Sequence, residues 1–111
     1  MALLEGIAYD ARMTSTYLFI SFEARPEATR DFAALLDQVR QELPRIPGCR
    51  AVRVFAHAEH AQRFSVFEEW DSAASHQAHI SHVVASGEWE RIRAYLSADP
   101  TSFYLHDSHP S

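Results

Sequence analysis

The chain has few of the residues and runs that define several large classes of protein. Its 111 residues include one cysteine, Cys49, which excludes an internal disulfide framework. So little cysteine suits a reducing compartment, and we expect a cytoplasmic protein. No apolar run approaches the roughly 20 residues that a membrane-spanning helix needs. The formal net charge is -5 and no basic patch is present, so the sequence argues against nucleic-acid and membrane partners.

Sequence motifs for several kinds of chemistry are also missing. There is no glycine-rich phosphate loop, no Ser-His-Asp spacing and no double-cysteine motif. No internal repeat, linker or low-complexity segment divides the chain, so its length predicts one domain with its own core. We expect an N-terminal arm at 1–16 that lacks the basic start of a secretory signal, a domain at 17–107 and a tail at 108–111.

The stretch 63–70 is predicted to be a strand that is apolar on both faces. Side chains alternate along a strand, so Val66 and Trp70 share one face while Phe67 lies on the other. A strand with one face in water would alternate more cleanly between apolar and polar residues. Asp71-Ser72 then supplies side-chain oxygens that can cap the first turn of a following helix.

Hydrophobic periodicity indicates the remaining elements of the domain. The predicted strands are 17–24, 50–57 and 101–107, and the predicted helical segments are 28–43, 72–84 and 88–98. The resulting order, β-α-β-β-α-β, predicts an α+β ferredoxin-like fold with an antiparallel sheet and both helices on one side.

Helices on one side leave the other face of this predicted sheet uncovered. Aromatic and aliphatic side chains point to both faces of most strands, so the uncovered face would form an apolar patch larger than monomers usually expose. A second copy of the same sheet would cover it, and we therefore expect a two-fold homodimer. A monomer that uses this face to bind a ligand is the alternative.

Four features of the sequence resemble the antibiotic biosynthesis monooxygenase family of dimeric α+β barrels. They are the two-sided first strand followed by Arg25-Pro26-Glu27, the turn Pro47-Gly48-Cys49, the junction Phe67-Glu68-Glu69-Trp70-Asp71-Ser72, and His79, nine residues after the tryptophan. The resemblance covers residues 17–107. It implies two copies packed sheet to sheet, each with an apolar pocket between its sheet and its helices. Characterised members oxygenate phenols or quinols without metal or flavin, so the resemblance implies no cofactor.

The sequence departs from two branches of that family. Some aromatic-oxidising members have a tryptophan equivalent to Trp70 and an asparagine four residues before it, where this chain has Val66. Haem-opening members use an asparagine on the first strand. This chain contains no asparagine, which argues against the haem branch.

Oxygenation without a cofactor needs an apolar cavity, a base whose pKa lies near the working pH, and donors for the substrate anion. Histidine is the natural base, and we expect His79 and His76 to be catalytic. Trp70 is expected to complete the catalytic set, because it could orient a planar ligand by stacking. The expected substrate-binding residues are Arg53, Phe67, Arg91 and Tyr95.

Three of the seven histidines, His76, His79 and His82, are spaced three residues apart on one predicted helix. They lack the His-Glu-x-x-His form or matched cysteines of zinc sites, so we expect no metal. The sequence predicts a cofactor-independent monooxygenase that uses O₂ on a phenolic, quinol-type or polyketide-like aromatic molecule. Two alternatives stay open: a non-catalytic ligand-binding or stress-response barrel, and a polyketide cyclase or isomerase that needs acid-base groups but no O₂.

Overall fold

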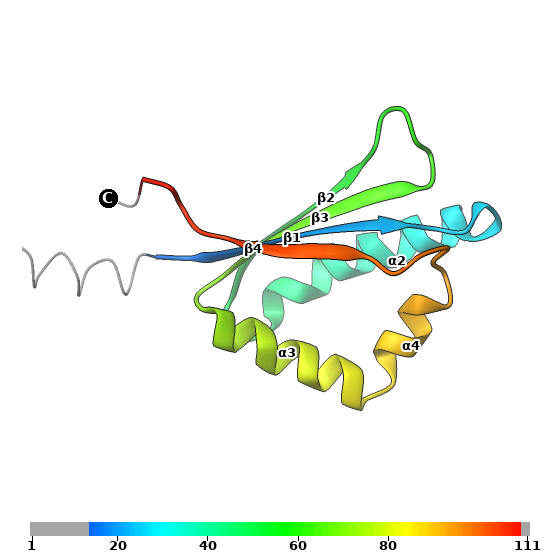
Figure 1. The fold of residues 1–111 in the computed structure, drawn as a ribbon. Helices are drawn as coiled ribbons and strands as arrows, with labels where there is room; N and C mark the ends of the chain where they lie inside the picture. Colours follow the sequence, from blue (N-terminus) through cyan, green and yellow to red (C-terminus); the bar gives the residue numbers. More distant parts are fainter. Residues whose placement is uncertain (1–13, 110–111) are drawn as a thin grey trace, which may run out of the picture.

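The sheet contains four antiparallel strands in the order β2-β3-β1-β4 (Figure 1). The computed structural model describes residues 14–109, and its strands are β1 (Thr16–Glu23), β2 (Cys49–Ala56), β3 (Arg63–Trp70) and β4 (Thr101–Leu105). β3 has the predicted bounds, and the other strands begin and end within two residues of the predicted ones. Most of the expected arm at 1–16 lies outside the described residues, and Thr16 already belongs to β1.

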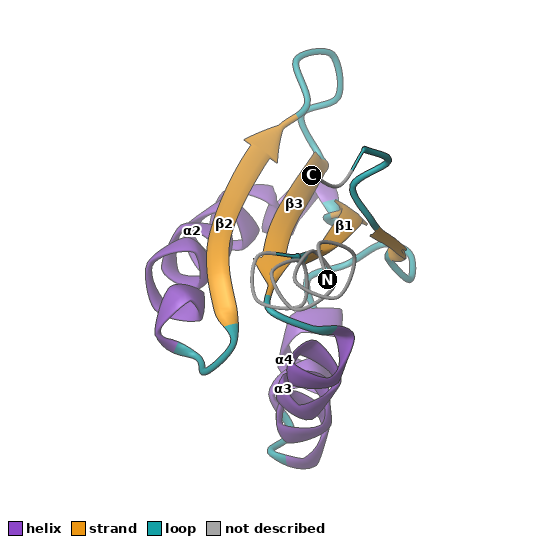
Figure 2. Ribbon diagram, turned by 90° about the vertical axis from the view of Figure 1, so that its left-hand side faces the viewer, coloured by secondary structure: helices purple, strands orange, loops and turns teal. Residues whose placement is uncertain are grey.

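The described helices lie on one side of this sheet (Figures 1 and 2). They are α2 (Thr29–Glu42), α3 (Ala73–Ala85) and α4 (Glu88–Arg93), with short 3-10 turns at Pro26–Ala28 and Leu43–Arg45. Strands and helices therefore follow the predicted order. The ferredoxin-like α+β fold expected from the sequence is confirmed.

Local sequence explains which side of α2 is buried and where α3 begins and ends. α2 buries Phe32 and Leu36, four residues apart, on the stripe that faces the sheet. α3 begins after Ser72, whose Oγ accepts a hydrogen bond from the Ser75 backbone N–H at 3.1 Å, as expected for a cap. Gly87 ends this segment with φ of 83°, a left-handed conformation that glycine adopts readily.

The predicted helix at 88–98 is wrong at its C-terminal end, because α4 stops at Arg93. Leu96 instead pairs with Ala24, just beyond β1, in an isolated antiparallel bridge. The Arg25 backbone N–H donates to the Tyr95 carbonyl at 2.8 Å, and the Leu96 side chain is buried. Pairing with the end of β1 and burial of Leu96 thus replace the last helical turn.

The core lies between the sheet and the helices. Its largest fully buried side chains are Trp70, Phe32 and Val66. The Phe32 ring packs edge-on against Phe22 of β1 and Phe64 of β3, at centroid distances of 5.4 and 5.6 Å. α2 is therefore fixed to the middle of the sheet, and this positions the wall of the cavity described below.

The opposite face, which we call the open face, is also rich in aromatic side chains. Phe19 stacks on Phe103 of β4, and Tyr17 stacks on Phe67 of β3. Phe103 keeps 54% of its surface exposed and Phe55 keeps 41%. The apolar character of both faces is confirmed, whereas the homodimer that would cover the open face stays a prediction.

Candidate functional site

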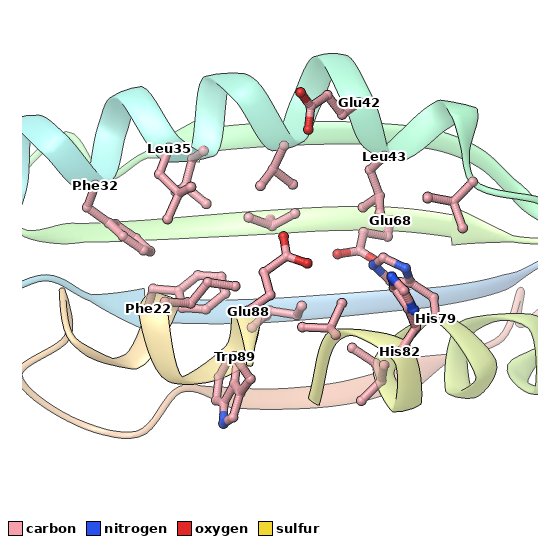
Figure 3. A pocket seen from close by; sticks show the side chains of 18 residues that line it. Phe22, Phe32, Leu35, Glu42, Leu43, Glu68, His79, His82, Glu88 and Trp89 are labelled. Atoms are coloured by element: carbon pink, nitrogen blue, oxygen red, sulfur yellow. The ribbon is translucent and has the colours of Figure 1, made fainter. Parts of the chain in front are cut away.

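An apolar cavity of about 260 Å³ lies between the sheet and the helices (Figure 3). Its walls come from β1, α2, β3, α3 and α4, and most are aliphatic or aromatic. The polar exceptions are Glu42, Glu68, Glu88, His79 and His82. Small-molecule sites usually measure ~300–1,000 Å³, so this cavity alone suits a ligand of one or two rings. A second depression, between α3, α4 and β4, shares part of its apolar wall.

Glu68 is a buried carboxyl group on the wall of this cavity. It lies two residues before Trp70 on β3, so both side chains point to the helix side of the sheet. The Trp70 indole Nε1–H donates to Glu68 Oε1 at 2.8 Å, and only 5% of Glu68 is exposed. Burial raises the pKa of Glu68 above its ordinary value, and the indole hydrogen bond opposes that shift.

His76 stands one turn into α3 and faces the same carboxyl group. Its Nδ1 shares a 2.7 Å hydrogen bond with the Tyr104 hydroxyl of β4. Its Nε2 is buried, has no hydrogen-bond partner among residues 14–109, and lies 4.0 Å from Glu68 Oε1. Burial lowers the pKa of His76, so the ring is neutral at pH 7.

His79 follows one turn later on the same side of α3 and lines the cavity. Its ring stacks on Trp70 with centroids 5.6 Å apart and planes inclined by 29°. Burial lowers the pKa of His79, while the nearby carboxylate of Glu88 acts in the opposite sense. A neutral imidazole on an apolar wall is suited to accept a proton from a bound molecule.

The structure brings together the three residues that the sequence predicted to be catalytic. Trp70 is fully buried and contacts both imidazole rings, with His76 edge-on at 5.3 Å and His79 stacked. Trp70 therefore supports the two histidines from behind, and the apolar residues that line the cavity provide the surface for a ligand. The catalytic roles of these residues stay predictions.

The four expected substrate-binding residues lie elsewhere. Arg53 pairs with Phe67 across β2 and β3, so both side chains lie on the open face, and Arg53 packs over the Phe55 ring at 5.0 Å. Arg91 and Tyr95 line a shallow depression outside the cavity, beside α4. None of these four side chains is on the cavity wall.

Sequence reasoning missed Glu68, which it named only as part of the junction between strand and helix. Arg53 lies on the opposite face from Glu68, because Arg53 is in register with Phe67. The available signal was the two-residue spacing between Glu68 and Trp70, which places a carboxyl group beside an indole N–H. Tyr104 was likewise predicted only as a strand residue, since its contact with His76 joins segments 28 residues apart.

Other reactive groups of the described chain contribute little to the site. Burial raises the pKa of the Cys49 thiol to about 11, so it is protonated at neutral pH and a poor nucleophile. Within residues 14–109, no three His, Cys, Asp or Glu side chains are grouped so that they could hold a metal ion. Over the same range, every helix is too short or too polar to cross a membrane.

Known structures with the same fold are numerous, at low sequence identity. A protein of unknown function from Nitrosomonas europaea is 22% identical, with a TM-score of 0.74 over 90% of this chain and 95% of that one. A conserved protein from Methanosarcina mazei Go1 is 18% identical, with a TM-score of 0.76 over 90% and 99%. A variant of SnoaB, a cofactor-independent oxygenase from Streptomyces nogalater, is 9% identical, with a TM-score of 0.72 over 86% and 94%.

Sequence comparison gives a more specific result than these structural similarities. No curated protein matches the chain. The sequence pattern of the antibiotic biosynthesis monooxygenase family, however, matches residues 16–95, which run from the first residue of β1 to just past α4. Together with the βαββαβ fold and the cavity between sheet and helices, this match shows that the chain belongs to the antibiotic biosynthesis monooxygenase family.

Proposed function

We propose that the chain is a cofactor-independent monooxygenase that oxidises a phenolic or quinol-type aromatic molecule with O₂ in the cavity. The observation that carries this proposal is the neutral His79 ring on a mostly apolar wall, stacked on Trp70. Membership of the family supports the class of reaction.

The reaction needs little from the protein. His79 accepts the proton of a ring hydroxyl, and the electron-rich anion then gives an electron to O₂. The radical and superoxide recombine at a ring carbon that bears hydrogen and form a carbon–oxygen bond, and the peroxide takes up the proton held by His79. Loss of water then breaks the O–O bond and the C–H bond at that carbon, which leaves one oxygen atom of O₂ in the product and the other in the water. The apolar walls keep bulk water away from the anion and hold the planar ring in place.

Oxygen uptake with anthrone and naphthol-type substrates tests this proposal. We expect uptake by the wild type, a loss of at least tenfold in kcat for His79→Ala, and unchanged kcat for the matched control His60→Ala, which alters an exposed loop histidine. Wild-type rates equal to the buffer rate for all such substrates would remove the oxygenase assignment. Equal rates for wild type and His79→Ala would remove only the role of the base.

Glu68 and His79 also support a second candidate function, a cyclase or isomerase that works without O₂. Both groups reach the Trp70 indole, one through a hydrogen bond and one by stacking. A carboxyl group with a raised pKa beside a neutral imidazole is an acid and a base on one wall. An anaerobic assay separates the two functions, because turnover without O₂ would favour the second.

Val66 gives a reason to consider a non-catalytic binding protein as well. It stands where some oxygenating relatives have an asparagine, so the cavity lacks that amide. Native mass spectrometry of the purified protein is the test. A retained small molecule that is not consumed under O₂ would favour a binding role.

We further propose that two copies associate through the open face. The exposed aromatic side chains of that face, including Phe55 and Phe103, supply the apolar surface that a partner sheet would bury. Sedimentation is expected to give a dimer at micromolar concentration. Phe103→Asp is expected to weaken association about 100-fold or more, because it would place an unpaired charge in the interface. A wild-type monomer at that concentration would refute the dimer.

A further inference from the structure

The charged side chains around the cavity are of one sign. Three carboxyl groups line it, Glu42 at the outer rim, Glu88 at the start of α4 and Glu68 at the inner end (Figure 3). The chain contains no lysine, and no arginine among residues 14–109 is on the cavity wall. Because burial keeps His79 neutral at pH 7, no positive side chain of the wall balances the carboxylates.

The inner end of the cavity also has more hydrogen-bond acceptors than donors. Glu68 accepts the Trp70 N–H through Oε1, and its Oε2 has no partner among the described residues. The Glu88 side chain, half-buried, likewise makes no hydrogen bond or ion pair with residues 14–109. Behind Glu68, the buried Nε2 of His76 lacks a partner too and accepts when Nδ1 donates to Tyr104. Among the described residues, His76 Nε2 is the side-chain polar atom that is both fully buried and without a partner, so the unpaired carboxyl oxygens of Glu68 and Glu88 are accessible. These accessible acceptors favour a ligand that brings donors.

Arg91 is a basic residue that lies near two of these three carboxyl groups. It lines the outer depression together with Glu42 and Glu88, and it makes no ion pair within 4.0 Å with either one. The Arg91 side chain is exposed and is absent from the cavity wall, whereas Glu88 and Glu68 are both on that wall. A cation inside the cavity would therefore meet these two carboxyl groups and not the guanidinium.

We propose that the cavity selects a small aromatic molecule with a protonated amine, held by Glu68 and Glu88, and discriminates against the corresponding carboxylic acid. An ammonium group has three donors and no acceptor, which matches the acceptors at the inner end. The apolar walls take the ring. The inference rests on the cavity of the proposed function and narrows its substrate class, because a positive group beside the ring would offset the negative charge of the deprotonated hydroxyl.

Binding of three matched probes to the full-length protein tests the proposal without any turnover. The probes are 1-naphthylmethylamine, 1-naphthalenemethanol and 1-naphthoic acid, which share a ring and differ in charge. Titration calorimetry at pH 7.5 is expected to give at least roughly tenfold tighter binding for the amine than for the alcohol. The acid is expected to bind more weakly than the alcohol, because the carboxylates repel it.

Variants show which carboxyl group is responsible for binding the amine. Glu88→Gln is expected to weaken the amine about tenfold and to leave the alcohol unchanged, since only the charge is removed. Glu90→Gln is the matched control, because Glu90 lies two residues further on the same helix, is exposed and is absent from the cavity wall. Arg91→Gln is expected to strengthen amine binding. Glu68→Gln should act as Glu88→Gln does, provided that its thermal unfolding shows a folded protein.

Three outcomes would overturn the inference: the acid binding as tightly as the amine, equal loss of amine affinity in Glu88→Gln and Glu90→Gln, or no binding of any probe. The proposed function fails separately. Tight, Glu88-dependent amine binding together with no oxygen uptake on amine-bearing phenols would support the selectivity and refute the oxygenase.

Discussion

The two faces of the sheet carry similar side chains in different surroundings, and Glu68 and Glu69 show the contrast most clearly. These neighbours in sequence point to opposite faces of β3. Glu68 is buried under the helices and accepts the Trp70 N–H, whereas Glu69 lies on the open face and accepts the Ser15 hydroxyl. Burial raises the pKa of Glu68. Glu68 thus differs from its neighbour because helices cover its face of the sheet. The alternating sequence pattern of β3 does not reveal which face they cover.

Aromatic residues differ between the faces in the same way. On the helix face Phe32 meets Phe22 and Phe64 edge-on and is fully buried. On the open face Phe19 and Phe103 stack with planes only 20° apart, and more than half of Phe103 stays exposed. The first cluster holds the fold together within one chain. The second cluster leaves apolar surface exposed, which is available for contact with another molecule.

The largest expected effect tests this difference directly. Phe32→Ala should lower the free energy of unfolding by about 3–5 kcal/mol, because it removes a fully buried ring. Phe103→Ala should lower the free energy of unfolding of the monomer by less than about 1 kcal/mol, since the ring is mostly exposed. Urea unfolding of both variants measures the two values.

Repeating the urea unfolding at several protein concentrations tests whether a second copy covers the open face. If a second copy covers the open face, the cost of Phe103→Ala grows with concentration while that of Phe32→Ala does not. A large decrease in the free energy of unfolding for Phe103→Ala that is the same at all concentrations would mean that the ring is buried within one chain. The difference between the two faces would then be refuted.

An intermediate effect is expected from the hydrogen bond that distinguishes Glu68. Trp70→Phe removes the N–H donor and should lower the free energy of unfolding by about 1–3 kcal/mol through the unsatisfied carboxyl group, in addition to the cost of the smaller ring. Trp89→Phe, on the cavity wall and half-buried, is the control for loss of an indole. Repeating Trp70→Phe in a Glu68→Leu background, which has no acceptor for the indole N–H, isolates the pair. An additive result would show no coupling between them.

The smallest expected effect is on the pH dependence of stability. The pKa values of His76 and His79 are lowered below 6.5 by burial, so the unfolded chain binds protons more readily than the folded one. Their contribution to stability is complete above about pH 6.5 and is lost as the pH falls through the folded-state pKa values. Glu68 has the opposite sign, because its raised pKa gives stability that is lost as pH rises above 4.5.

Variants separate these opposing contributions. His76→Gln should flatten the acid-side loss of stability between pH 6.5 and 5, measured by urea unfolding at several pH values, with His60→Gln as the control for loss of a histidine. An unchanged pH profile in His76→Gln would show that burial of this ring does not affect its titration.

Much of the fold could be predicted from the sequence, because period-two and helical patterns act over short distances. These patterns predicted the strand at 63–70 with two apolar faces and the helix at 28–43, which buries Phe32 and Leu36. They failed at Leu96, which continues a helical pattern but pairs with Ala24, 72 residues away. No local pattern contains that contact.

The candidate site was predictable only in part, for a similar reason. His76, His79 and Trp70 lie within ten residues, so helix and strand geometry bring them together. Arg53 was misplaced because its face depends on the register between β2 and β3, which a break at Cys49 and Ala51 shifts. Register between strands is fixed by many distant contacts, and the sequence alone does not reveal it.

Both tryptophans of the chain contact residues of the same site or line it, so the intrinsic fluorescence of the protein reports on that site. Trp70 is sealed in the core against two imidazole rings, while Trp89 lies on the cavity wall. Emission from the sealed indole should respond to charge on those rings, and emission from the other should respond to a molecule entering beside it. One fluorescence spectrum could therefore follow protonation and occupancy together, with Trp89→Phe used to separate them.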